Sequence, residues 1–590
     1  MTESFLELRR ELRALPAKKR VDRILERKDA LKVVRALPVQ DIYATVREIG
    51  AEDSLELLEL CSARQVQAFL DLDGWRGDRL DGAAMATWLR ALFAANPDRA
   101  VGQFRGLDLE LLTLIVKLHT RVYDLSAEEE PEDDVGLHSI TPDQRYLIAY
   151  GGVGDDDKMQ GVLKEAVDRL MGRDMLFVLR LCEAVRWELP SSLEEDSFRW
   201  RNARLADLGF LPRHEALEIF GWRDPDAPLE APPARVEPVM TDDLESPSAD
   251  LSTSVLFPWE ALNDGAAAFA QATRELSLLA RERVAHETML TANRVHCADQ
   301  GDPGDPEALK ATAKQVVDTV GVALSYRCEG DPRKLPAVLA STSVQTLFRV
   351  GHSLSLKLQR ELKSRIEARD SGLSGNGLLR LDSPLREAAA GLLRGRPLLY
   401  AGLLDARRVD YRPPASLVEL AALSRAVLEI GFRAALLGPR GLQVTDDKLP
   451  KDPAEQPSHG ALLGAWLAHR LLGRRLAPGE MVPVARDELR VLRQKIMDSV
   501  ARVEAIDAFA DASRAFAPLP GAPSADEVQT KARSYASQVM DAVASELTVL
   551  ERNPDERFVV TVWTTAAPAR AVAHEDGDDD DDDDFDGQDE

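Results

Sequence analysis

Apolar positions in residues 37–75 recur at helical spacing in short groups, each preceded by a signal for a helix start. Pro38 and Gly50 fit the first turn and the end of one helix, and Ser62 with Gln65 has the spacing of a capping box before another. The apolar positions that define these faces are Ile42, Val46, Ile49, Leu55, Leu58, Val66, Phe69 and Leu70. Helices this short need neighbours stacked on them, so we expect residues 1–125 to form a short-helix repeat domain.

The helical pattern resumes after an acidic stretch and predicts that residues 137–222 continue the first domain. Thr141 to Gln144 has capping-box spacing, and Pro142 would take the first helical position. Six aromatic residues of this region are expected in the core: Trp187, Phe198, Trp200, Phe210, Phe220 and Trp222.

Residues 223–255 are rich in proline and acidic side chains and predict a linker or a strap laid over the surface. A helical-bundle domain is expected over 256–552, ending in two antiparallel helices with long apolar stripes. The first stripe runs from Leu489 to Phe509, and the second follows the capping box Ser524–Glu527. Residues 553–570 are expected to be extended, with 557–564 as the one strand-like piece.

These patterns predict an all-α protein with a solenoid-like N-terminal domain of short helices, a bundle of longer helices and a disordered acidic tail over residues 571–590. Aromatic residues make up only 5% of the chain, as expected of a helical rather than a β protein. The four cysteines are far apart and form no CxxC pair, which favours a reducing compartment. With neither a secretory pattern nor a membrane span expected, we predict a cytoplasmic protein.

Charge is distributed unevenly along the chain, whose formal net charge is −26. The last seventeen residues contain twelve acidic groups, whereas residues 9–35 contain eleven Lys or Arg against four Asp or Glu. Overall acidity makes nucleic-acid binding an unfavoured interpretation, and only the segment 9–35 offers a surface for it. The acidic tail could contact a basic partner, or the basic segment 9–35 of its own chain.

Asp71, Asp73 and Asp78 surround Gly74–Trp75 and are the one cluster that suggests chemistry. Carboxylates this close could hold Mg²⁺ together with water, or act as an acid–base pair. The alternative is a packed turn, because Asp73–Gly74 is a strong turn dipeptide. No catalytic residue, and no cofactor other than this possible Mg²⁺, is predicted.

The segment LPVQDIYATVREIGAEDSLELLELCSARQVQAFLDLDGW resembles the N-terminal superhelical domain of the MgtE-type magnesium transporters. That resemblance covers about 60–80 residues and implies a solenoid of short helices and, at Asp71, Asp73 and Asp78, a Mg²⁺-responsive acidic surface. The whole chain also resembles an uncharacterised bacterial family of long helical proteins, which implies no known activity.

Three functional hypotheses follow from the sequence. The first is a cytoplasmic helical scaffold or adaptor that binds protein partners, because solenoids present long surfaces. The second is a Mg²⁺-responsive regulatory protein. The third is an enzyme whose site is assembled from dispersed Arg, Glu and aromatic residues of the second helical region.

Overall fold

The computed structural model divides the chain into two compact units, each with its own core. It describes residues 2–565 except 128, 132–134, 152–156, 233–266, 445–446, 448, 453–454, 478 and 553–558. Unit 1 comprises Met1–Gln359 and Gly391–Leu423, and unit 2 comprises Arg360–Ala390 and Ser424–Glu590. The described chain is mostly helical, which confirms the all-α prediction.

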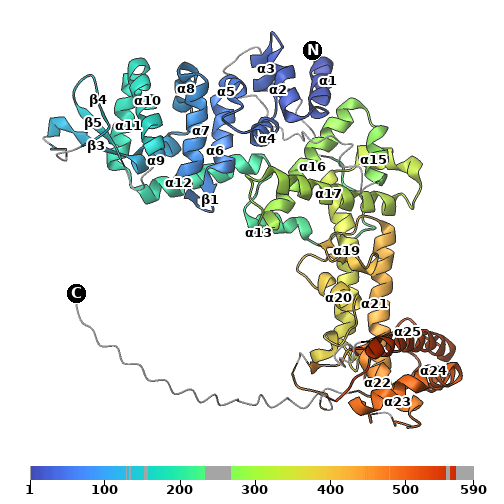
Figure 1. Ribbon diagram of the computed structural model, residues 1–590. Helices are drawn as coiled ribbons and strands as arrows, with labels where there is room; N and C mark the ends of the chain where they lie inside the picture. The colour runs from blue at the N-terminus through green and yellow to red at the C-terminus, as the bar shows by residue number, and fades with distance from the viewer. Residues whose placement is uncertain are drawn as a thin grey trace, which may run out of the picture. The chain divides into compact units, whose positions relative to one another are not determined.

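Unit 1 begins with a succession of short helices that follow one another along the unit (Figure 1). They are α1 (Thr2–Arg13), α2 (Ala17–Leu25), α3 (Ala30–Ala36), α4 (Val39–Ile49), α5 (Leu55–Leu60), α6 (Ala63–Asp73), α7 (Gly82–Ala95), α8 (Pro97–Arg105) and α9 (Leu109–His119). The predicted signals are confirmed: Gly50 ends α4 at φ +108°, and Ser62 with Gln65 forms a capping box on α6. A two-residue hairpin, β1 (Trp75–Arg76) with β2 (Arg79–Leu80), separates α6 from α7.

A three-stranded antiparallel sheet interrupts the helices. The prediction that a helix begins at Thr141–Gln144 is therefore wrong. β3 (Thr120–Asp124) and β4 (His138–Ile140) both pair with the central β5 (Tyr146–Tyr150). Thr141 to Gln144 forms the turn between β4 and β5 rather than a helix cap, with the Tyr146 backbone N–H donating to Thr141 Oγ1 at 2.9 Å. The run YLIAY contains two tyrosines and a β-branched isoleucine and is buried on both faces, which favours a central strand.

The helices after the sheet include most of the long ones of unit 1, and they complete its core. They are α10 (Asp157–Arg173), α11 (Met175–Trp187), α12 (Pro190–Asp207), α13 (Arg213–Ala216), α15 (Ala267–Arg274), α16 (Leu278–Ala298), α17 (Pro306–Arg327), α18 (Leu335–Ser341) and α19 (Val344–Glu367). One cluster of buried side chains extends from Leu8 to Val350. The short hairpin β6 (Leu399–Tyr400) with β7 (Tyr411–Arg412) also belongs to this unit.

The predicted linker does not separate the two units. In the described part of it, the Arg223 backbone N–H donates to Ser353 Oγ at 2.9 Å, and the Ser343 N–H donates to the Glu230 carbonyl at 3.0 Å. Residues 223–232 therefore lie as a strap along α19, and the residues on both sides of the predicted linker belong to unit 1. The remainder, 233–255, lies outside the described residues.

Unit 2 is built around α21 (Leu417–Leu437), α22 (His459–Leu471), α23 (Leu489–Ile496), α24 (Ser499–Ser513) and α25 (Ala525–Arg552). The division between the units falls within α19, α20 (Leu385–Leu392) and α21, so both units include part of each of these helices. The predicted capping box of α25 is confirmed, since Glu527 N–H donates to Ser524 Oγ at 3.2 Å. The prediction that the long apolar stripe starting at Leu489 lies on a single helix is wrong. Asp498 caps a new helix, α24, and leaves Val500 63% and Val503 56% exposed.

The last described segment, residues 559–565, packs onto unit 2. Val559 and Val562 are buried in its core, and Thr564 forms a single parallel bridge with Val484. The sequence expectation that 557–564 holds the one strand-like piece is therefore wrong, because the paired strands lie in unit 1. The predicted acidic tail, 571–590, lies outside the described residues. None of the helices in the described part of the chain has the length and apolarity that a bilayer crossing requires.

Candidate functional site

Asp71 lies at the centre of a buried ion pair. Its side chain is 1% exposed, and Arg204 on α12 donates to its two oxygens at 2.6 and 3.0 Å. Gln67 donates a further hydrogen bond at 3.0 Å, and Arg201 donates to the Asp71 backbone carbonyl at 2.6 Å. Burial raises the pKa of Asp71, opposed by the hydrogen bonds from Arg204. Arg204 also contacts Asp108, so this pair ties α6, α9 and α12 together.

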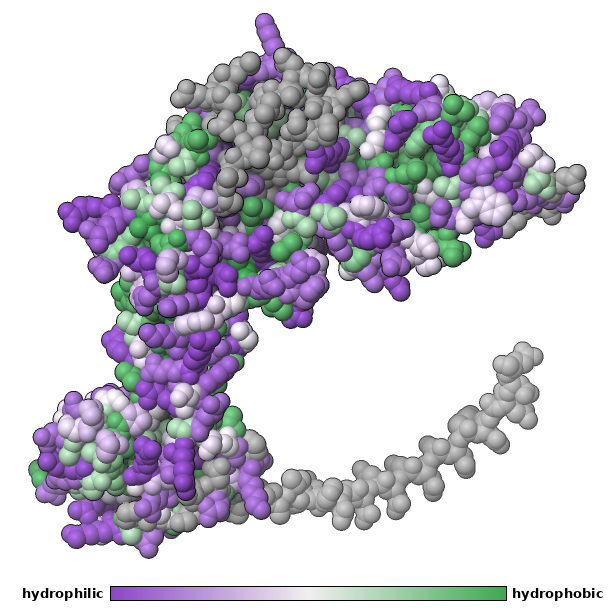
Figure 2. All heavy atoms as spheres, turned by 180° about the vertical axis from the view of Figure 1, so that it is seen from behind, coloured by the Kyte–Doolittle hydropathy of each residue, from purple (hydrophilic) through white to green (hydrophobic). Residues whose placement is uncertain are grey.

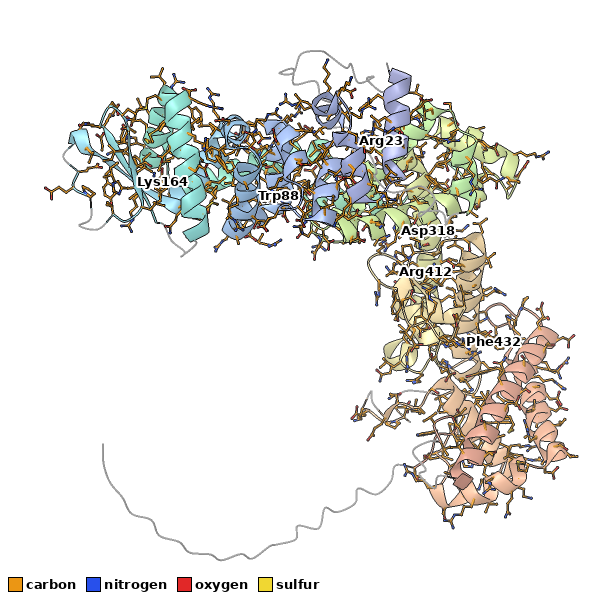
Figure 3. The ribbon with its side chains drawn as sticks, turned by 45° about the horizontal axis from the view of Figure 1, so that its top comes forward. Arg23, Trp88, Lys164, Asp318, Arg412 and Phe432 are labelled. Atoms are coloured by element: carbon orange, nitrogen blue, oxygen red, sulfur yellow. The ribbon has the colours of Figure 1, made fainter. Side chains whose placement is uncertain are left out.

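Asp73 and Asp78 have different surroundings from Asp71. Asp73 Oδ2 accepts from the indole N–H of Trp88 at 2.9 Å and from Arg47 at 3.1 Å, whereas Asp78 is exposed beside the β1–β2 hairpin. Trp88 is one of the buried side chains labelled in Figure 3. The turn interpretation fits the hairpin, because Gly77 between the strands has φ +65°.

These surroundings do not fit a magnesium site. Both oxygens of Asp71 are turned to a guanidinium, and a cation ligand set needs carboxylates that face one another across a shared ion. Among the described residues, no group of three or more His, Cys, Asp or Glu side chains is arranged to hold a metal ion. Binding of Mg²⁺ by Asp71, Asp73 and Asp78 together stays a prediction that solution measurement must decide.

The basic segment 9–35 is partly used inside unit 1. Arg20 is buried and donates to Thr45 Oγ1 at 2.8 Å and to the Leu12 and Leu15 carbonyls. Arg9 pairs with Glu282 at 3.5 Å with both side chains buried. Several of the charges counted in the sequence therefore stabilise the short helices, and the exposed basic groups include Lys18 and Lys19.

An arginine–aromatic network joins the sheet to α11. Arg145 and Tyr146 on the sheet both contact Glu183 of α11: the Arg145 guanidinium lies 2.6 Å from Glu183 Oε1, and the Tyr146 hydroxyl donates to the same oxygen at 2.5 Å. Trp187 donates its indole N–H to the other Glu183 oxygen at 3.2 Å. Arg186 stacks over the rings of Tyr146 and Trp187 at 5.9 and 5.5 Å. Hydrogen bonding and charge pairing together give these side chains one arrangement.

Two acidic groups complete this network. Arg186 donates to Asp124 at 2.8 Å and to Glu129 at 2.5 Å. Hydrogen bonds from Ser126 lower the pKa of Asp124, with Arg145 and Arg186 adding to the effect. The hydrogen bond from Tyr146 likewise lowers the pKa of Glu183. The carboxylates of Asp124 and Glu183 are therefore charged at neutral pH, and they hold Arg145 and Arg186 in place.

The network borders an exposed side of α11 on which two large apolar residues flank two charged ones. Leu176, Arg180, Glu183 and Trp187 are spaced by four, three and four residues, which places them on one side of the helix. Leu176 is 70% and Trp187 73% exposed, and Leu189, just beyond the helix end, is 64% exposed. In the space-filling view, hydrophobic side chains reach the surface of unit 1 as green patches among hydrophilic ones (Figure 2).

The core prediction for the aromatic residues is therefore wrong for all three tryptophans. Trp187, Trp200 and Trp222 are 73%, 46% and 38% exposed, although Phe210 is buried. The sequence of α11 is apolar on several sides, so periodicity alone could not say which side faces solvent. The available signal was the offset of Leu176 and Trp187 from the stripe that is buried, Val178, Leu181, Cys182 and Val185.

Unit 2 contains a buried polar cluster of its own. Asp382 accepts from the Gly460 N–H at 2.9 Å and from the Tyr535 hydroxyl at 2.9 Å, and Arg433 lies 3.7 Å away. His459 is 2% exposed, and its Nδ1 has no hydrogen-bond partner among the described residues. Burial lowers the pKa of His459 to about 4. The described contacts of Asp382 link α21, α22 and α25.

The fold and these surfaces define a large α-helical protein with two cores, an inserted three-stranded sheet and an exposed arginine–aromatic surface. The chain belongs to a family described as "Family of unknown function (DUF6178)", whose model matches residues 1–565. Neither the comparison with curated proteins nor that with solved structures gives a match.

Proposed function

We propose that this protein is a helical scaffold or adaptor and that it binds a protein partner through the outer side of α11. The observation that carries the proposal is Trp187, which is 73% exposed and held in one orientation by Glu183 and Arg186. Tryptophan and arginine are the residues most enriched among those that dominate binding energies at protein interfaces. A fixed aromatic side chain also loses little conformational entropy when a partner covers it.

The exposed area is large enough to matter for affinity. A tryptophan buries roughly 150–250 Å² when fully covered, so covering the exposed part of Trp187 would contribute about 3–4 kcal/mol at 25 cal/mol per Å². Leu176 and Leu189 would extend the covered area along α11 and beyond its end. The charges of Arg145, Glu183 and Arg186 would form the polar rim expected around such a centre.

A reducing compartment remains part of this proposal. The four cysteines are free thiols, and burial raises the pKa of Cys61 to about 12. We therefore propose a cytoplasmic partner. The Mg²⁺-responsive and enzymatic alternatives stay predictions.

The test is site-specific photocross-linking of the full chain in its native cells. A photoreactive amino acid at position 187 is expected to capture one protein, and the same protein should co-purify with the unmodified chain. Trp187→Ala should weaken that co-purification roughly 30-fold or more, because a central interface residue contributes 2 kcal/mol or more. Val409→Ala, which alters a side chain that is 76% exposed on another part of unit 1, is the matched control.

The melting temperature of Trp187→Ala should equal that of the unmodified chain, since the side chain lies mostly in solvent. Capture of the same proteins from positions 187 and 409 would contradict the proposal. So would undiminished co-purification of the partner with Trp187→Ala.

A further inference from the structure

The outer side of α23 in unit 2 is basic and exposed. Leu489, Leu492 and Ile496 bury the inner side of this helix. Arg490, Val491, Gln494 and Lys495 occupy the opposite side and are exposed. Arg490 and Lys495 have no ion-pair partner among the described residues. Val491 is 48% and Met497, just after the helix, 71% exposed, so apolar groups lie beside the charges.

The segment that contains α23 is basic, whereas the segment that follows it is acidic. Residues 470–495 contain seven Lys or Arg against three Asp or Glu, whereas residues 496–565 contain six against eleven. Of the acidic groups near α23, Glu488 is already paired with Arg474 and Asp498 caps α24, which leaves exposed Asp487 just before the helix. The exposed side of α23 is therefore a local positive surface in an acidic protein, and such a surface attracts a polyanion.

The described chain ends beside this same helix. Thr565 donates its N–H to the Val484 carbonyl at 3.0 Å, and its own carbonyl accepts from Arg486 Nε at 2.8 Å. Arg486 begins the single 3₁₀ turn, Arg486–Glu488, that leads directly into α23. The chain that leads on to the acidic run thus leaves the described structure near the N-terminal end of α23.

We propose that the acidic run Asp578–Asp584 binds the exposed Arg490–Lys495 side of α23 in the same molecule. Twelve residues separate Thr565 from Asp578. They can span up to roughly 45 Å when extended, and an eight-residue helix is only about 12 Å long. A tether of this length gives an effective concentration in the millimolar range, so weak charge pairs suffice for binding.

The composition of the run matches the surface that it would cover. Seven consecutive aspartates would face Arg490 and Lys495, and Phe585 directly after them can contact Val491 or Met497. This contact lies in unit 2 and is independent of the function proposed for α11. Its consequence is that the chain's own acidic segment shields α23, so an acidic partner has to displace it.

Zero-length carbodiimide cross-linking of the full-length chain tests the contact. The reagent joins a lysine amine only to a carboxylate that touches it, so Lys495 is expected to cross-link to Asp578–Asp584. The yield should fall as salt rises from 20 to 500 mM, because exposed charge pairs are screened. An equal mixture of ¹⁴N- and ¹⁵N-labelled chains at low concentration separates links within one molecule from links between molecules.

Two charge-reversal variants make the test specific. Arg490→Glu retains the reactive lysine, removes one attraction and adds a repulsion, so the Lys495 yield should fall about fivefold. Lys18→Glu reverses an exposed charge of the basic segment 9–35 and should leave the Lys495 yield unchanged. Equal melting temperatures will show that both variants are folded.

Three results would overturn the proposal. They are links concentrated on Lys18 and Lys19 in place of Lys495, a Lys495 yield that is unaffected by Arg490→Glu, and Lys495 links found only between differently labelled chains.

Discussion

Replacing Arg204 with Met is expected to destabilise unit 1 by about 3–5 kcal/mol at pH 7. The variant removes the two hydrogen bonds that Arg204 donates to the side chain of Asp71, and it leaves a carboxylate that is 1% exposed with the hydrogen bond from Gln67 but without its cation. An unpaired buried charge costs this much because neither water nor another charge solvates it. Met retains most of the volume of the arginine stem, so the loss of packing is small.

The destabilisation caused by Arg204→Met depends on pH, and the burial of Asp71 determines the direction of this dependence. Burial already raises the pKa of Asp71, and removing Arg204 will raise it further. The folded variant then binds a proton more tightly than the unfolded chain, whose aspartate titrates near pH 4. Its stability therefore falls as pH rises from about 4 to the new pKa, so the cost of Arg204→Met is smaller at pH 5 than at pH 7.

Hydrogen exchange in increasing urea is the suitable assay, because peptides from α6 and α12 report unit 1 separately from unit 2. Asp71→Asn alone should cost about 2 kcal/mol, since it removes hydrogen bonds to a charged group. The double variant should cost less than the sum of the two, by about 2 kcal/mol. Arg23→Met is the control: Arg23 (Figure 3) pairs with Glu11 at 2.8 Å, and both are exposed, so stability should hardly change.

The same variants decide between an ion pair and a metal site at Asp71. We expect the loss of stability in Asp71→Asn to be equal in millimolar MgCl₂ and in chelator. Additive costs in the double variant would refute the ion-pair reasoning. A wild-type melting temperature that rises with Mg²⁺, and no longer rises in Asp71→Asn/Asp73→Asn, would revive the magnesium hypothesis.

Three further predictions concern other groups of the chain. Unit 2 should lose about 2 kcal/mol between pH 7 and 5 because the unfolded chain protonates His459 near pH 6.5 and the folded chain only near pH 4; urea unfolding should show a smaller loss in His459→Gln. Ser62→Ala should cost about 1 kcal/mol in the same assay by removing the cap of α6, whereas exposed Ser499→Ala should be nearly neutral. The thiols of Cys61 and Cys182 should react with a disulfide reagent at pH 8 only after unfolding, because burial raises the pKa of each to about 12.

Local signals in the sequence were sufficient to predict several helix ends in both units. Gly50, the Ser62–Gln65 box and the Ser524–Glu527 box all act over three or four residues, and each appears where the spacing placed it. A capping side chain bonds to a backbone N–H of its own first turn, so it needs no information from the rest of the fold. The predicted helical class rests on the same local preferences.

Features that depend on distant residues were not predictable in this way. Residues 141–144 satisfy the rule for a helix cap, yet they form a turn because β5 finds partners in both β3 and β4. The stripe after Leu489 satisfies the rule for one helix, yet Asp498 caps a second one. In both cases two local solutions exist, and tertiary pairing or a competing cap decides between them.

The candidate site shows the same limit at the level of side chains. Asp71 suggested chemistry because three aspartates are close in sequence, but its partner Arg204 is 133 residues away and converts the group into a structural ion pair. Trp187 suggested core because tryptophan is usually buried, but its helix already buries another side, and Glu183 and Arg186 hold the ring at the surface. Sequence spacing identifies side chains that can lie close together. The role of each one depends on which residues from distant parts of the sequence contact it in the fold. In this chain the candidate site therefore lies on the outer side of α11 rather than in the acidic cluster around Gly74.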